Sequence, residues 1–375
     1  MLAQATRRGT ACAVASATPT RINLSRTANP LARPSHRTFA STSTSRSHEN
    51  PLGLPRNNQR IPPTMPRRGG PPQPRRIPHV KHVVCVSSGK GGVGKSTISS
   101  NLAVALAHTQ RPGTRRPRVG LLDLDIFGPS VPKLMGLEGM GEAELTRDGA
   151  LIPLTNHGVR CMSMGFLLGN TRADADGEEE RVVAWRGMMV MKATQQLLFD
   201  VDWRQDPHAA RTSTGGGEEG GLDVLVIDMP PGTGDVALSL AQLVEVDAAL
   251  VVTTPQEVAL LDARKGVAMF RKTNVPVAGL VLNMSHFVSP DTGRAFELFG
   301  NAAAVERYAD KQKIEVLARI PLQPHVSAGG DSGTPVTLRE TLETQDADGK
   351  ALTQDNLIRT AFLDLAQRVW TRLQS

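Results

Sequence analysis

Cysteine is scarce in this sequence of 375 residues, and long apolar runs are absent. A run of about 18 apolar residues, the shortest that spans a bilayer as a helix, does not occur, so the sequence predicts no transmembrane segment. Cys12, Cys85 and Cys161 lie too far apart for a disulfide framework or a CxxC metal site within one chain. We therefore expect the thiols to be reduced. The chain can bury a sizeable core, since 39% of its residues are hydrophobic.

Acidic residues are missing from the first 48 positions, which hold seven arginines and many serines and threonines. This composition is typical of a mitochondrial transit peptide and predicts a protein of the mitochondrial matrix. The segment from Arg37 to Ser41, in which an arginine lies shortly before Phe39, resembles a matrix-protease cleavage site. The alternative is a disordered basic tail. Residues 49–79 contain nine prolines and predict an extended linker, so we expect the folded domain to comprise residues 80–375.

The net charge of +7 is unevenly distributed along the chain. Residues 1–82 carry 14 Lys and Arg against the single acid Glu49, which leaves 29 basic and 35 acidic residues in the remainder. Because that remainder is mildly acidic, the sequence predicts no nucleic-acid partner.

After residue 80, short apolar runs alternate with longer amphipathic ones. This alternation predicts an α/β fold with a mostly parallel central sheet and helices on both faces. The expected strands lie at residues 82–88, 119–125, 222–228, 248–253 and 277–282. The expected helices begin after the first strand and at residues 258 and 351.

A glycine-rich loop joins the first expected strand to the first helix. Its residues are Gly89, Lys90, Gly91, Gly92, Val93, Gly94, Lys95, Ser96 and Thr97. Backbone N–H groups surround a phosphate only where no Cβ blocks the approach, and the helix N-terminus adds partial positive charge. We expect a P-loop in which Lys95 reaches the β- and γ-phosphates of ATP and Ser96 binds Mg²⁺. The strand and helix that flank it favour this interpretation over a simple glycine turn.

A second lysine, Lys90, directly follows the first glycine of this loop. The pattern GKGGVGKS resembles the deviant Walker A motif of the dimeric ParA/MinD/ArsA ATPases. That resemblance implies that Lys90 crosses a dimer interface to the partner's phosphates and supplies charge there during hydrolysis. The alternative is a solvated loop lysine.

Acidic residues end two further strands, where parallel sheets place their ligands. Asp228 is predicted to be the Walker B acid that holds Mg²⁺ through water. Asp125 is our candidate for orienting the attacking water, and Asp123 is expected beside the metal. Acids at strand ends are often helix caps, so either motif alone is a weak signal. Their joint order behind a P-loop indicates an ATPase.

Several segments together resemble the Mrp-type iron–sulfur carrier ATPases over nearly all of residues 80–340. They read GKGGVGKST, LLDLDIFGPSVPKLMGL, CMSMGFLL, AWRGMMVMKATQQLL, DVLVIDMPPGTGD, TTPQEVALLDARKGVAMF and GLVLNMS. The N-terminal region most resembles the mitochondrial nucleotide-binding-protein-like branch, which assists assembly of respiratory complex I. The resemblance implies that Asn283 contacts adenine, that the protein dimerises, and that it hands iron–sulfur clusters to recipient proteins.

One departure from this family falls on the cluster ligands. Such carriers have Cys-Pro-x-Cys after the NMS motif, so that two chains offer four thiolates to one [4Fe-4S] cluster. Here the corresponding residues are Ser289, Pro290, Asp291 and Thr292, and hydroxyls replace thiolates poorly. Cys85 and Cys161 are expected to fill the core. The sequence thus identifies no iron–sulfur ligand in this chain alone.

Two functional hypotheses remain open. The first is an ATPase that supports iron–sulfur assembly, as a cluster-free homodimer or as a heterodimer with a related ATPase. The second is a nucleotide-gated scaffold or positioning switch of the ParA/MinD type that binds no cluster.

Overall fold

The computed structural model describes residues 73–109, 115–125, 128–141, 143–167, 187–205, 220–289, 292–339 and 354–374. The predicted transit peptide, residues 1–48, and most of the predicted linker lie outside these ranges. No helix within the ranges combines the length and apolar character needed to cross a membrane.

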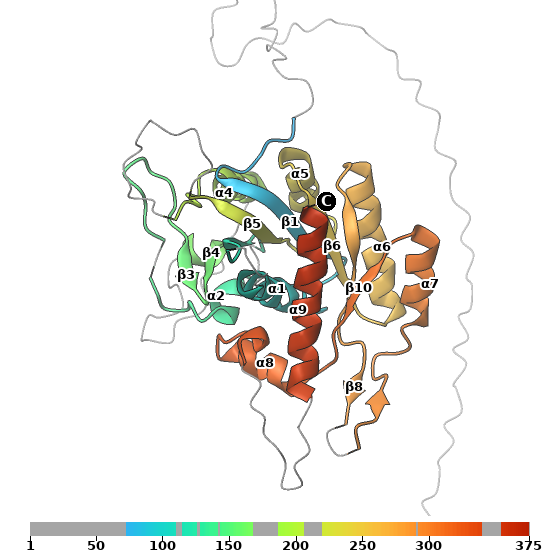
Figure 1. The fold of residues 1–375 in the computed structure, drawn as a ribbon. Helices are drawn as coiled ribbons and strands as arrows, with labels where there is room; N and C mark the ends of the chain where they lie inside the picture. Colours follow the sequence, from blue (N-terminus) through green and yellow to red (C-terminus); the bar gives the residue numbers. More distant parts are fainter. Residues whose placement is uncertain are drawn as a thin grey trace, which may run out of the picture. The chain divides into compact units, whose positions relative to one another are not determined.

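Eight strands form the central sheet (Figure 1). Their order across the sheet is β10 (Val316–Arg319), β7 (Val277–Leu282), β6 (Ala248–Thr253), β1 (Val80–Ser88), β5 (Leu222–Asp228), β2 (Val119–Asp123), β4 (Val159–Ser163) and β3 (Leu154–Asn156). All neighbouring strands run parallel except β3 and β4. The five strands expected from the sequence are all present, and the strand that precedes the P-loop lies in the middle of the sheet.

The inner strands are apolar because helices cover both of their faces. Every residue of β6 and every residue of β2 is buried, and in β1 the last six residues are buried. These runs are rich in valine, leucine and isoleucine, which suit a pleated surface that packs on both sides.

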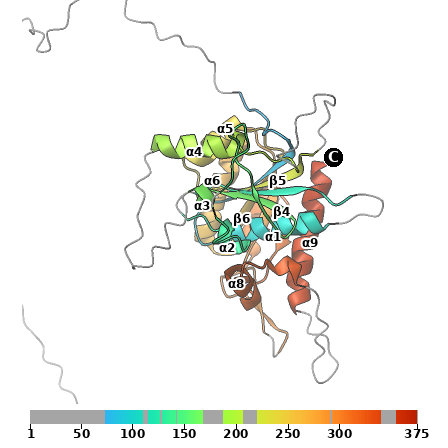
Figure 2. The same cartoon turned by 90° about the vertical axis from the view of Figure 1, so that its left-hand side faces the viewer.

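Helices cover both faces of the sheet, as the sequence predicts. The helices α1 (Lys95–His108) and α9 (Gln354–Leu373) pack side by side on one face, and α4 (Gly187–Phe199), α5 (Asp235–Leu243) and α6 (Glu257–Lys272) lie on the other (Figures 1 and 2). In α9 the predicted apolar stripe is buried: Ile358, Phe362 and Leu365 are 0% exposed.

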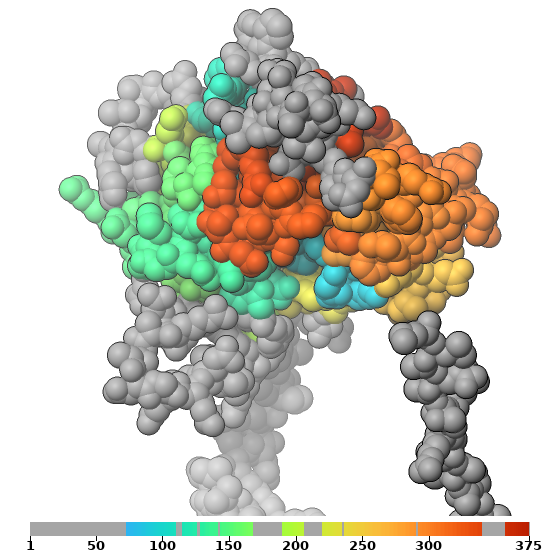
Figure 3. Space-filling model, turned by 90° about the horizontal axis from the view of Figure 1, so that it is seen from below, coloured from blue at the N-terminus to red at the C-terminus, as the bar shows by residue number. Residues whose placement is uncertain are grey.

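Shorter elements lie near the P-loop end of the sheet. They are α2 (Val131–Leu134), α3 (Met164–Leu167), α8 (Pro324–Asp331), the 3₁₀ turn η1 (Val336–Leu338), and a hairpin of β8 (Phe287–Val288) and β9 (Ala295–Phe296). Helix α7 (Ala303–Gln312) instead lies alongside α6, where Arg271 in the last turn of α6 donates to Gln312 (Figure 1). Seen from this end, α8 lies between the segment that contains α2 and the segment that contains the hairpin (Figure 3).

The packed part of the chain begins before Val80, inside the segment predicted to be linker. The Arg75 backbone pairs with Val244, and its guanidinium lies 3.6 Å from the centre of the Phe199 ring. Ile77 is only 2% exposed and belongs to the core. The proline-rich composition obscured this contact, because a single isoleucine among prolines carries no periodic signal.

Candidate functional site

The P-loop joins the end of β1 to the start of α1, as its spacing predicts. Gly92 and Gly94 have φ of 79° and 82°, the left-handed region that side chains with a Cβ rarely adopt. A Cβ on Gly94 would lie 2.2 Å from Nδ2 of Asn283, whereas one on Gly91 or Gly92 would meet nothing within 4 Å. The loop is therefore braced at its base and open at its tip, where a phosphate could approach the backbone.

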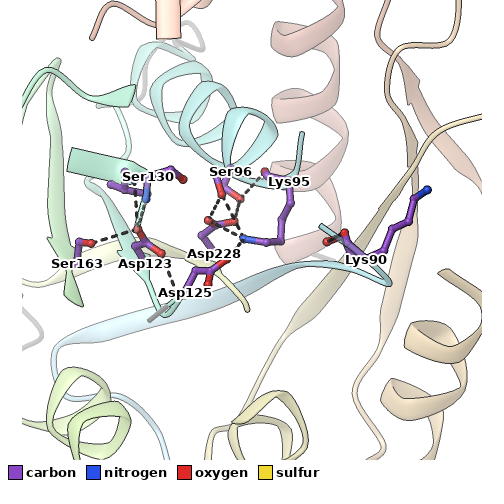
Figure 4. Close-up of polar contacts among 11 residues, drawn as sticks. Lys90, Lys95, Ser96, Asp123, Asp125, Ser130, Ser163 and Asp228 are labelled. Atoms are coloured by element: carbon purple, nitrogen blue, oxygen red, sulfur yellow. Dashed lines mark hydrogen bonds and ion pairs between the residues drawn. The ribbon is translucent and has the colours of Figure 1, made fainter. Parts of the chain in front are cut away.

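Lys95, Ser96 and Asp228 form a compact polar cluster under this loop (Figure 4). The Lys95 ammonium lies 2.8 Å from Oδ2 of Asp228, and the Ser96 hydroxyl donates to the same oxygen at 2.6 Å. Lys95 is 6% exposed and the Asp228 side chain is fully buried. A hydroxyl and a carboxylate so close together are hard oxygen donors of the kind Mg²⁺ prefers, so the residues present fit this ion.

Asp125 and Lys90 lie on two sides of this cluster. Oδ2 of Asp125 is 4.0 Å from the Lys95 ammonium, and its side chain is 16% exposed. Lys90 extends away from Lys95 and Asp228 (Figure 4). The structure thus brings Asp125 toward the predicted catalytic centre and directs Lys90 away from it within one chain.

Asp123 has a different environment from the one expected. One of its oxygens, Oδ1, accepts from the backbone N–H of Asp125 at 2.9 Å. The other, Oδ2, accepts from the Ser163 hydroxyl at 3.1 Å and from the N–H groups of Ser130 and Val131, both at 3.2 Å. The carboxylate therefore anchors the start of α2 and the segment after β2. Its contacts are with the protein, and a metal role for it stays a prediction.

Burial and the nearby charge of Asp228 raise the pKa of Asp123 to about 7. The hydrogen bonds from Asp125 and Val131 and the charge of Lys95 act in the opposite direction. Two carboxylates at neighbouring strand ends thus share the influence of the Lys95 ammonium.

Asn283 contacts the P-loop itself. Its side-chain amide donates to the Val93 carbonyl at 2.8 Å, and the residue is 7% exposed. This bond ties the end of β7 to the loop that precedes α1. The adenine contact implied by the family resemblance stays a prediction.

Sequence reasoning missed Ser99, which lies one helical turn after Lys95. Its fully buried hydroxyl is 2.7 Å from Oδ1 of Asp228 and 3.0 Å from the Lys95 carbonyl. The Ser99 hydroxyl has a single proton to donate, and of its two neighbours the charged carboxylate of Asp228 is the stronger acceptor. The spacing of four residues in the predicted helix was the available signal, because it places Ser99 on the same face as Lys95.

The residues that replace the family's cysteines lie in the β8–β9 hairpin. The N–H of Ser289 donates to the Arg294 carbonyl at 2.9 Å, and Thr292 is exposed; Pro290 and Asp291 lie outside the described residues. Cys85 and Cys161 are fully buried, which raises the pKa of both thiols. Within the described part of the chain, no group of three or more His, Cys, Asp or Glu side chains could hold a metal ion.

Comparisons with known proteins point to one family. Residues 79–355 match a family model described as "ParA: NUBPL iron-transfer P-loop NTPase". The chain is 42% identical over 306 residues to the mouse iron–sulfur cluster transfer protein NUBPL, covering 82% of each chain. It is 38% identical over 301 residues to an Arabidopsis thaliana protein named "Iron-sulfur protein required for NADH dehydrogenase, mitochondrial", covering 80% of this chain and 82% of the relative.

Among solved structures, the chain is similar to a nucleotide-binding protein from Archaeoglobus fulgidus in complex with ADP. The identity is 33% and the TM-score is 0.54, and the match covers 69% of this chain and 88% of that one.

Proposed function

Because the chain belongs to the ParA-type family of NUBPL iron-transfer P-loop NTPases, we propose that it is a mitochondrial ATPase that supports iron–sulfur cluster assembly for respiratory complex I. The observation that carries the proposal is the buried cluster of Lys95, Ser96 and Asp228 beneath an open glycine loop.

In the proposed mechanism, ATP displaces the contact between Lys95 and Asp228. The Lys95 ammonium then moves from the carboxylate to the β- and γ-phosphate oxygens, while the loop N–H groups hold the phosphates. Ser96 and Asp228 would hold Mg²⁺, which supplies positive charge to the transferring phosphoryl group. The ion pair between Lys95 and Asp228, at 2.8 Å, thus belongs to the nucleotide-free state. When ATP binds, its phosphates replace Asp228 as the partner of the Lys95 ammonium.

Asp125 and Lys90 take the roles of water orientation and charge supply in this proposal. Asp125 is already close to the Lys95 ammonium, at 4.0 Å, so a small movement of the segment after β2 places its carboxylate beside the γ-phosphate. Lys90 extends away from its own site (Figure 4), a direction that suits contact with the nucleotide of a second chain. We propose that the active form is a dimer and that a single chain hydrolyses ATP slowly.

The iron–sulfur cluster is the cargo of this system. We propose that this chain alone binds no stable cluster, because Ser289 and Thr292 present hydroxyls and the two described cysteines are buried. A related ATPase subunit with thiolates in the corresponding hairpin would then carry the cluster in a heterodimer. The complex I role rests on the name of the Arabidopsis relative. The mitochondrial matrix as location rests on that name and on the acid-free N-terminal segment.

The missing ligands favour one second candidate function. A cluster-free, nucleotide-gated scaffold would use the same P-loop and dimer to control docking of partner proteins. The two candidates differ in one respect: a heterodimer of the scaffold would contain no iron, whereas a heterodimer of the assembly ATPase would carry the cluster.

Two measurements test the proposal. Lys95→Ala should lose most of the affinity for Mg·ATP, while Lys311→Ala on the exposed end of α7 should keep it; equal affinities would refute the nucleotide site. Iron and sulfide analysis after anaerobic reconstitution tests the cargo. We expect less than one iron per wild-type chain and a strong gain in Ser289→Cys/Thr292→Cys, whereas about four irons per wild-type dimer would show that the ligands lie elsewhere.

The location has its own test. A reporter fused to residues 1–48 should reach the mitochondrial matrix and be cleaved near Phe39, because the membrane potential draws a positive segment inward. A reporter that stays uncleaved in the cytosol would favour the disordered basic tail.

A further inference from the structure

A cavity of about 750 Å³ lies at the end of the sheet opposite to the P-loop. Its walls include residues 76–81, which lead into β1, together with Leu222 and Asp223 at the start of β5 and Arg118 just before β2. Since β1, β2 and β5 are parallel, their first residues lie at the edge far from the helix N-terminus that follows β1. The proposed ATPase mechanism uses no residue of this cavity.

Positive charge dominates the cavity lining. Arg76, Lys81, Arg115 and Arg118 line it, and Asp223 is the one carboxylate among the lining residues. Arg115 binds both oxygens of Asp223, each at 2.7 Å.

Pairing leaves part of this charge uncompensated. Arg76 pairs with Glu245 just outside the cavity, at 3.0 Å. Lys81 is exposed and forms no ion pair with any residue that the structure describes. Arg115 and Arg118 share the single carboxylate of Asp223, so these two arginines and Lys81 leave a surplus of positive charge in the lining.

Arg118 lines the cavity and is only loosely paired there. Its Nε is buried and has no hydrogen-bond partner among the described residues. The nearest carboxylate oxygen, Oδ2 of Asp223, is 3.7 Å away, too far for a hydrogen bond. Asp223 also binds Arg115, so one carboxylate balances two guanidinium groups, and an anion bound in the cavity would add negative charge beside them.

The electrostatic field near Arg118 also affects a neighbour. Burial lowers the pKa of Arg160, and the charge of Arg118 lowers it further. The charge of Asp202 acts on the pKa of Arg160 in the opposite direction.

We propose that this cavity binds a small organic polyanion through carboxylate or phosphate groups. Its volume lies within the range of about 300–1,000 Å³ that small-molecule sites occupy, and guanidinium groups match carboxylate and phosphate oxygens in geometry. The chain's own linker is a poor occupant, because residues 50–72 carry four arginines and no acid.

Titration calorimetry with citrate, and separately with inorganic pyrophosphate, tests the site on the full chain at low ionic strength without Mg²⁺. Wild type and Lys95→Ala should both bind at least one of these anions with a dissociation constant below about 1 mM. Lys81→Glu and Arg118→Gln should each weaken that binding by about tenfold or more. Lys311→Glu, the same charge change on an exposed helix end, should leave it unchanged.

The variants separate this cavity from the nucleotide site. Lys95→Ala disables the proposed P-loop function, so anion binding that persists there and is lost in Lys81→Glu belongs to the cavity. Binding of citrate alone would identify a carboxylate site, and binding of pyrophosphate alone a phosphate site. The proposal is overturned if neither anion binds wild type, if Lys95→Ala abolishes binding, or if folded Lys81→Glu binds as wild type does. Since Lys81 is exposed, that variant keeps the test valid where Arg118→Gln fails to fold.

Discussion

The hydroxyl of Ser99 and the carboxylate of Asp228 meet at 2.7 Å inside the core, between the P-loop helix and the neighbouring strand β5. Both side chains are fully buried. Ser99 holds Oδ1, which leaves Oδ2 turned toward Ser96 and Lys95. This pairing sets the orientation of the acid that we propose for Mg²⁺.

Ser99→Ala should therefore weaken the response of ATP hydrolysis to Mg²⁺. Losing a hydrogen bond to a buried charge costs about 1.5–3 kcal/mol, so we expect the Mg²⁺ concentration for half-maximal activity to rise roughly tenfold or more. Ser100→Ala is the matched control, because its buried hydroxyl has no hydrogen-bond partner among the described residues. Equal Mg²⁺ titrations of the two variants would contradict the positioning role.

Lys90→Ala and Asp125→Asn should separate nucleotide binding from turnover. If both residues act mainly in the transition state, each variant keeps most of its ATP affinity and loses about 10²-fold or more in hydrolysis. Equilibrium binding and single-turnover hydrolysis measure the two quantities. Wild-type hydrolysis rates in either variant would rule out the role proposed for that residue.

Gly333→Ala should loosen the contact between α8 and the turn after α2. A Cβ at this position would lie 2.3 Å from the Cα of Gly136, and the φ of Gly333 is 68°. We expect a loss of about 1–3 kcal/mol or more in the free energy of unfolding, measured by urea titration.

Gly149→Ala separates backbone strain from collision. Gly149 has a φ of 82°, but a Cβ there would meet nothing within 4 Å. This variant should lose stability through backbone strain alone. If its loss in the free energy of unfolding is as large as that of Gly333→Ala, a tight contact between Gly333 and Gly136 is ruled out as the cause.

The contribution of Asp123 to the free energy of unfolding should fall as the pH rises from about 4 to 7. Its pKa of about 7 in the fold is above the ordinary value of 3.8, so over this range the folded state keeps a proton that the unfolded chain has released. Asp123→Asn has no such titration. The stability advantage of wild type over Asp123→Asn should therefore narrow between pH 5 and pH 8.

Urea titrations at both pH values measure this change. Asp148→Asn, which makes the same substitution at an exposed position, is the matched control. An advantage of wild type that grows with pH would mean that the carboxylate is stabilised by its four hydrogen-bond donors more than it is destabilised by burial.

Much of the fold and of the candidate site followed from local sequence signals. The β-branched run of β1 and the buried runs of β2, β5, β6 and β7 identify parallel strands. The glycines of the P-loop identify the turn, because positive φ at Gly92 and Gly94 leaves few alternatives. The order of these elements, with acids at two strand ends, was enough to place Asp125 and Asp228 near Lys95.

Other features depended on which elements become neighbours. Asp123 ends β2 beside β4 and above α2, so Ser163 and Ser130 reach it, and no local pattern pairs these residues. Asn283 likewise meets Val93 only because β7 and the P-loop end at the same edge of the sheet. The packing of Arg75 on Phe199 adds part of the predicted linker to the domain.

The sequence by itself determined five strands of the central sheet, the helices α1, α6 and α9, and the phosphate-binding loop, because each depends on residues close together in the chain. The remaining strands β3, β4 and β10 of the sheet were found only in the structure. The sequence also determined that the hairpin lacks cysteine ligands, a matter of composition alone. Only the tertiary structure decided the partner of each buried charge and the existence of the cationic cavity. The partners of Asp228 and of Asp223 are set by strand order and by contacts across more than 100 residues. In the low dielectric of the interior, a polar group is costly unless its neighbour pairs with it.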